Sequence, residues 1–222
     1  MSELTLFFYE DGHSDPFSRI NWPSGRPHLQ ALLIAEAKVA LVNSGFIMAN
    51  TPPGHRIFFV SYSPWTNEHE NAKETLKSMG VSYEERIQKL GETEVGLFRR
   101  HRVDRWAHHI FSSTDRGDVI KSVFDSYTSW ESGWPFFFFV AKEEPTGWKK
   151  MVDVLSSGEA CPQNLVLESH CIMRTVEDHG ILISSVKITE MEVKSAVAIL
   201  AKELSMYPTV KRFAAQNVRE PN

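Results

Sequence analysis

Cysteine is scarce in this sequence: Cys161 and Cys171 are the two thiols among 222 residues. Two isolated cysteines exclude the disulfide framework of a small secreted protein and the ligand set of a zinc knuckle. The scarcity favours a reducing compartment, so we expect a cytoplasmic protein.

Long apolar runs and targeting signals are also missing. No stretch approaches the ~20 apolar residues that span a bilayer. The N-terminal sequence "MSELTLFFYEDG" has neither the basic start nor the apolar length of a signal peptide. We therefore expect no membrane partner.

The sequence lacks the common catalytic motifs. It has no Gly-x-Gly-x-x-Gly, no phosphate-binding loop, no Gly-x-Ser-x-Gly and no His-Glu-x-x-His. We therefore predict no catalytic residues, no metal site and no cofactor, and these absences favour a non-enzymatic protein. The net charge of −4 likewise excludes a protein that binds polyanions by its overall charge, so any nucleic-acid contact would need a local basic patch.

Aromatic residues are abundant, with 14 Phe and 6 Trp. The four consecutive phenylalanines at 136–139 are the densest group. Side chains of a strand alternate between its two faces, so this strand would be apolar on both. We predict a central strand that is covered on both sides.

Periodicity and turn residues predict alternating strands and helices. The predicted strands are 4–10, two within 46–63 around Pro-Pro-Gly, 81–87, 134–142, a hairpin over 169–188, and 208–214. The predicted helices are 27–45, 66–80, 146–158 and 189–207, the last with a Thr189/Glu192 capping box and Pro208 after it.

This order predicts an α+β fold, with a mixed or antiparallel sheet and helices packed on it. Residues 1–91 and 132–222 each resemble a ferredoxin-like βαββ half in their order of elements, with 92–131 as a helical insert between them. The alternative is that all three segments form one compact domain.

The segment "GLFRRHRVDRWAHHIF" (residues 96–111) holds four arginines and three histidines. At 100° per residue it predicts an amphipathic helix with a basic outer face. His101 and His108 would then lie about 10 Å apart along the axis, which is too far for one metal ion.

Residues 58–85 resemble the opening β-α-β unit of glutaredoxins: a strand with Tyr-Ser, a loop, a helix with Ala-Lys, Gly-Val and a strand. Where that family places Cys-x-x-Cys, between Tyr62 and Ala72, this sequence has "TNEHE" at 66–70. Without these thiols there is no thiol–disulfide exchange, and we infer no glutaredoxin function.

We therefore predict a binding protein that recognises a macromolecular partner, such as an immunity, antitoxin or inhibitory adaptor protein. The alternative is a nucleic-acid-binding or RNA-processing protein that uses the basic segment, with a histidine as acid or base. A third alternative is a small-molecule enzyme with its site in the loop 11–26. The candidate binding residues are Arg99, Arg100, His101, Arg102, Arg105, His108, His109, Trp22, Arg26, Trp65 and Trp148, and the three tryptophans are expected to be exposed.

Overall fold

The computed structural model describes residues 2–9, 29–63, 66–95, 101–126, 136–153, 162–176 and 180–213 of the chain. The strands are β1 (Glu3–Tyr9), β2 (Leu29–Ala35), β3 (Arg56–Ser63), β4 (Tyr83–Val95), β5 (His101–Thr114), β6 (Phe137–Ala141), β7 (Cys171–Val176), β8 (Gly180–Ser185) and β9 (Tyr207–Phe213). The helices are α1 (Val39–Ala49), α2 (Thr66–Ser78), α3 (Gly117–Ser126), the 3₁₀ turn η2 (Trp148–Lys150), α5 (Gln163–Glu168) and α6 (Glu190–Leu204).

All nine strands form one sheet in the order β4-β5-β3-β6-β7-β8-β2-β1-β9. Neighbouring strands are antiparallel except β1 and β9, which are parallel. The protein therefore has the predicted α+β fold with a mixed sheet.

The ferredoxin-like detail of the prediction is not confirmed. Strands from residues 1–91 lie at both sides of the sheet, and β6, β7 and β8 from the C-terminal part lie between them. Residues 92–131 are not a helical insert, because they contain the end of β4, all of β5 and α3. The domain boundaries themselves stay a prediction.

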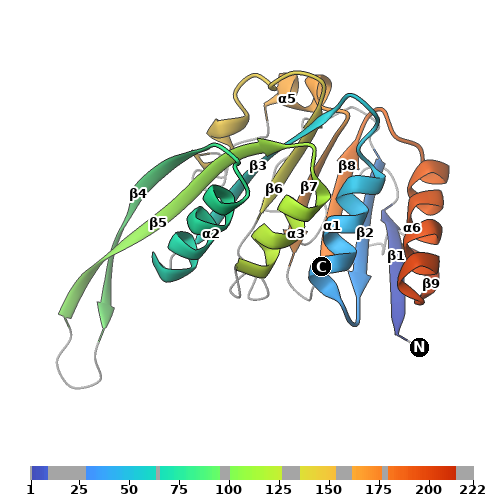
Figure 1. Cartoon of the computed structure of the whole chain (residues 1–222), viewed down its shortest axis with the longest axis horizontal. Coiled ribbons are helices and arrows are strands. Elements are labelled where there is room, and N and C mark those ends of the chain that lie inside the picture. The colour runs from blue at the N-terminus through green and yellow to red at the C-terminus, as the bar shows by residue number, and fades with distance from the viewer. Residues whose placement is uncertain are drawn as a thin grey trace, which may run out of the picture.

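Helices cover one face of the sheet, and a smaller layer covers part of the other. The first layer consists of α1, α2, α3 and α6, in which α3 packs on α1 and α2, and α6 packs on α1 (Figure 1). Below it lies the main hydrophobic core. Residues of η2 and α5 pack with the sheet residues of a second core, among them Trp148 and Leu165.

The phenylalanine run confirms the prediction of a central strand covered on both sides. Phe136 and Phe138 belong to the main core below the helices, whereas Phe137 and Phe139 belong to the second core. The strand β6 pairs with β3 on one side and β7 on the other. Its apolar residues are therefore buried in both directions.

Other predicted elements are also confirmed. The first strand, the helix starting at Thr66, the hairpin β7–β8 and the helix α6 all occur close to their predicted positions. Both hydrogen bonds of the predicted capping box between Thr189 and Glu192 are formed. The predicted last strand, 208–214, occurs as β9.

The predicted helix 27–45 is wrong. Residues 29–35 form β2, which pairs with β1 and β8, and the helix α1 begins only at Val39. An apolar run such as "LQALLIA" suits a buried strand as well as a buried helix, so periodicity alone does not separate them. Residues 46–49, predicted as part of a strand, are instead the last turn of α1.

The predicted helix 96–111 is also wrong, because residues 101–114 form the strand β5. This strand pairs along its length with β4, and from His108 onward it pairs with β3 on its other side. The backbone hydrogen bonds of a sheet therefore replace those of a helix.

The predicted helix 146–158 is described only at its start. Residues 148–150 form the 3₁₀ turn η2, residues 151–153 continue as a helical turn, and 154–161 lie outside the described residues. Within the described ranges, no helix is long and apolar enough to cross a membrane.

Candidate functional site

The hairpin of β4 and β5 projects from the body of the protein, as the green strands in Figure 1 show. These strands have 13 and 14 residues, whereas the other strands have between five and eight. On its other side β5 pairs with β3 only over residues 108–114. Beyond His108 the hairpin therefore continues as a two-stranded ribbon.

One face of this hairpin points toward the helix layer, and we call it the helix-side face. It consists of the cross-strand pairs Glu85–Ile110, Ile87–His108 and Lys89–Trp106. Ile110 is buried in the core below the helices. Farther along the hairpin, Ile87 is 54% exposed and Trp106 is 44% exposed. The Lys89 ammonium group lies 6.0 Å from the centre of the Trp106 ring, which is a cation–π contact.

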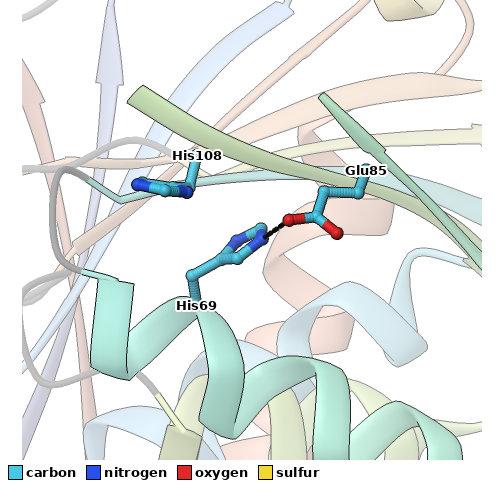
Figure 2. Close-up of side chains that lie close together, drawn as sticks. All are labelled: His69, Glu85 and His108. Atoms are coloured by element: carbon cyan, nitrogen blue, oxygen red, sulfur yellow. Dashed lines mark hydrogen bonds and ion pairs between the residues drawn. The ribbon is translucent and has the colours of Figure 1, made fainter. Parts of the chain in front are cut away.

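A polar cluster lies at the root of this face, where the hairpin leaves the sheet (Figure 2). It combines His69 from α2, Glu85 from β4 and His108 from β5. The His69 and Glu85 side chains are joined by a hydrogen bond of 2.7 Å between Nε2 and Oε1. The centres of the two imidazole rings are 4.9 Å apart. Residues from three elements therefore meet at one point.

The position of His69 in α2 explains its burial. Ala72 and Leu76 are buried on the same helix, and the spacing of three and four residues puts them on one face with His69. His69 is therefore held in the layer between α2 and the sheet, where its side chain is fully buried. Glu85 and His108 reach it from two adjacent strands.

Lys73 and Glu70 extend the cluster along α2. Lys73 Nζ lies 3.1 Å from the second carboxylate oxygen of Glu85 and 2.8 Å from Glu70. The hydrogen bond to Glu70 is the main reason that the pKa of Lys73 is raised. Burial opposes the ionisation of Glu85, but the hydrogen bonds from His69 and Lys73 outweigh it, so the pKa of Glu85 lies below its usual value.

The hydrogen-bonding of the two histidines is incomplete. An ionised carboxylate only accepts hydrogen bonds, so Nε2 of His69 carries the hydrogen that it donates to Glu85. The buried Nδ1 atoms of His69 and His108 have no hydrogen-bond partner among the described residues. Burial is also the main reason that the pKa of His108 is lowered, which favours its neutral form.

The structure separates the other predicted site residues. His109 follows His108 on β5 and therefore lies on the opposite face, where it is buried next to Phe111. Burial, and next the charge of Arg86, lowers the pKa of His109 to about 4. Trp148 was expected to be exposed, but it is only 4% exposed because its ring packs against Phe58, Phe111 and Phe139.

The remaining predicted residues have little or no description. The backbone of β5 includes His101, Arg102 and Arg105, which pair in register with Val95, Glu94 and Gly91. Their side chains lie outside the described part of the chain, as do Trp22, Arg26, Trp65, Arg99 and Arg100. The loop 11–26 of the small-molecule alternative also lies outside it.

Sequence analysis missed His69 and Glu85 as site residues. The argument against a metal site at 96–111 used helical spacing, and that spacing does not apply to a strand. The sequence signal that could have identified His69 as a buried residue is its position on a helix, three residues before Ala72 and seven before Leu76. The contact with Glu85 and His108 depends on sheet pairing, which no local pattern specifies.

A second surface feature lies between α1 and α6. This groove of about 750 Å³ is lined mostly by apolar residues, including Met48, Ala49, Ala196 and Leu200, and by the exposed Met191 and Ile199. It lies on the α6 side of the helix layer and shares no residue with the hairpin.

Comparisons with known proteins give no family for this chain. No family model matches it, and no significant match occurs among curated proteins or solved structures. The functional argument therefore depends on the geometry alone.

Proposed function

We propose that this protein binds a protein partner through the helix-side face of the β4–β5 hairpin. The observation that carries this proposal is the exposure of Trp106 and Ile87, which are diagonal neighbours on one face of the hairpin where the projecting ribbon begins. A large aromatic residue of this kind is a typical centre of a binding interface, because its burial removes much apolar surface from water.

The geometry of the ribbon supports this function. A two-stranded hairpin has little stability of its own, so the β4–β5 ribbon depends on its root for its position. The root is fixed to the body on both faces. The cluster of His69, Glu85 and His108 lies on one face, and the ion pairs Arg86–Asp153 and Lys149–Glu84 lie on the other. Trp106 lies two residues beyond His108, at the start of the ribbon, so the fixed root can hold it in place for a partner that covers this face.

The charge of the hairpin favours a protein over nucleic acid. Residues 83–105 contain six Arg or Lys and five Asp or Glu. A surface for phosphate groups would be expected to carry a clear excess of positive charge. A near balance of the two signs, in a hairpin that also carries an exposed tryptophan, is instead typical of a protein interface with a polar rim and an apolar centre.

Within this function, an immunity, antitoxin or other inhibitory adaptor protein is the class that we propose. A projecting ribbon suits this class because it can enter the cleft of a partner enzyme. A cytoplasmic location belongs to the same proposal and is based on the two cysteines. Nucleic-acid binding through the arginines of residues 99–105 is the competing function that the experiment must distinguish.

The test is site-specific photo-crosslinking in cells that naturally express the protein. A photoreactive amino acid replaces Ile87 on the hairpin, or Met191 on α6 as a matched exposed control. We expect one protein adduct from position 87 that resists nuclease and is absent from position 191. Excess wild-type protein or excess Met191→Ala variant should compete for the partner and reduce the yield of this adduct. Excess Trp106→Ala variant should not reduce it.

Three results would contradict the proposal. The first is that positions 87 and 191 give the same adducts, which would indicate unspecific contact. The second is equal competition by Trp106→Ala. The third is an adduct that consists of nucleic acid or disappears with nuclease, which would establish the competing function.

A further inference from the structure

We infer that His69, Glu85 and His108 bind a transition-metal ion of the zinc class. This inference goes beyond the proposed function and does not depend on it. Each residue offers one ligand atom, and these three atoms lie within 4.8 Å of one another. Two imidazole nitrogens and one carboxylate oxygen form a ligand set that zinc accepts, with a fourth position open to water.

The distances require only a small adjustment. Around a tetrahedral ion with bonds of about 2.1 Å, ligand atoms are about 3.4 Å apart. On binding, the ion would replace the hydrogen between Nε2 of His69 and Oε1 of Glu85, and the neutral His69 imidazole would carry its hydrogen on Nδ1 instead. The 2.7 Å contact would open slightly, and the remaining contacts, at most 4.8 Å, would close. Glu85 on β4 and His108 on β5 both lie on the side of the sheet that faces α2, so changes of their side-chain torsions would make this adjustment (Figure 2).

The residue types of the cluster suit a cation. A metal ligand must be a carboxylate or a neutral imidazole, and the cluster offers one carboxylate and two imidazoles. The buried Nδ1 atom of His108, which lacks a hydrogen-bond partner among the described residues, is a second indication that the cluster has unused ligand capacity.

Lys73 is a positive charge beside the site, and its contacts leave Oε1 of Glu85 to an ion. It approaches the Oε2 atom of Glu85, whereas Oε1 points to His69. Its charge is also compensated by Glu70 at 2.8 Å. Lys73 therefore orients the carboxylate and leaves Oε1 for the metal, as hydrogen-bonding neighbours of metal ligands commonly do.

The position of the site gives the ion a structural consequence. Its ligands come from α2, β4 and β5, so a bound ion would join the helix layer to the root of the hairpin. A ligand that binds only the folded state raises its stability. We therefore expect zinc to raise the melting temperature as well as to bind.

The experiment is a zinc titration of the full chain, purified without a histidine tag and stripped with a chelator. Binding is measured against a competing colorimetric chelator, and stability by thermal unfolding. The site variants are Glu85→Gln and His108→Asn, which preserve much of the side-chain shape. The control is His170→Gln, since His170 is a partly buried histidine in the groove between α1 and α6.

The wild-type chain and the control should bind one zinc ion and melt at a higher temperature when it is present. Each site variant should bind zinc at least tenfold more weakly, with little change in melting temperature upon zinc addition. Circular dichroism of the metal-free variants checks that they are folded. If a variant does not fold, Co²⁺ is bound to the wild-type chain in place of zinc and its visible absorption is measured. The band position, compared with that of His₂-carboxylate sites, then decides the ligand set.

Two results would overturn the inference. One is a wild-type chain that binds no zinc at micromolar concentrations. The other is a folded Glu85→Gln, His108→Asn double variant that binds zinc as tightly as the wild-type chain, which would place the ion at other histidines. Because no partner protein is needed, failure of this experiment leaves the crosslinking test unaffected.

Discussion

Nε2 of His69 on α2 and Oε1 of Glu85 on β4 are 2.7 Å apart and connect the helix layer to the root of the projecting hairpin. The histidine is fully buried and the carboxylate is 31% exposed. A buried donor that is paired in this way becomes costly when its partner is removed, because the donor then lacks any hydrogen bond. This contact is therefore expected to matter for stability as well as for the position of the hairpin.

The first prediction concerns this pair. Glu85→Ala should lower the free energy of unfolding by about 1–3 kcal/mol, since it leaves the buried His69 donor without a partner. The measurement is urea unfolding with a chelator present, so that no metal contributes. Glu84→Ala is the matched control: Glu84 is exposed on the opposite face, and loss of its ion pair with Lys149 should cost less than about 1 kcal/mol. Equal effects of both variants would contradict the role assigned to the His69–Glu85 contact.

The second prediction concerns the centre of the main core. The Phe138 ring is fully buried and packs against Phe59 and Phe124, at centre-to-centre distances of 6.3 and 5.5 Å. Phe138→Ala should lower the free energy of unfolding by about 3–5 kcal/mol, as expected for a large cavity in a core. Phe138→Leu fills most of that space and should cost clearly less. Chemical unfolding of both variants makes this comparison, and a small effect of the alanine variant would show that β6 is not central.

The third prediction concerns pH. Burial opposes the ionisation of Glu190 at the start of α6, but hydrogen bonds from Arg212 and Lys194 outweigh it and hold its pKa below the usual value. A carboxyl group with a lowered pKa stabilises the folded state above its unfolded pKa, and this contribution disappears as the pH falls through its folded pKa. Glu190→Gln should therefore be slightly less stable than the wild-type chain at pH 7 and equally stable at acidic pH.

Urea unfolding between pH 7 and pH 3 follows this difference. The partners are partly exposed, with Glu190 and Arg212 joined across α6 and β9, so the effect at pH 7 should stay below about 1 kcal/mol. Glu143→Gln, at an exposed position in the turn after β6, serves as a control that should show no such trend. A difference that grows toward acidic pH would contradict the assigned ion pair.

Local sequence patterns predicted much of the fold where one pattern fits one structure. The run Phe136–Phe139 is apolar on both faces of a strand, and the Thr189/Glu192 pair is a specific helix start. Both predictions are confirmed. The helix predicted over residues 29–35 was wrong, because a short apolar run fits a buried helix as well as a buried strand. Only the pairing with β1 and β8 decides between them.

The candidate site could be predicted only in part, for a similar reason. Residues 101–111 have apolar positions at helical spacing, but β5 is held by its neighbours β3 and β4, and sheet pairing overrides this local pattern. His108 was therefore predicted as a candidate residue, but it was placed on a helix and without its neighbours His69 and Glu85. The meeting of His69, Glu85 and His108 joins residues up to 39 positions apart in the sequence, as the difference between residue numbers 108 and 69 shows. Trp106 lies in the same segment but was not among the candidate residues.

The most direct test of the account is the affinity of the crosslinked partner for the Trp106→Ala variant, measured with purified components by calorimetry. We predict that the dissociation constant rises at least tenfold, or about 1.4 kcal/mol, while the melting temperature stays nearly unchanged because the Trp106 side chain is 44% exposed. The control variant Met191→Ala, on α6, should bind like the wild-type chain. An unchanged dissociation constant for Trp106→Ala would contradict the proposal that the helix-side face of the hairpin is the binding surface.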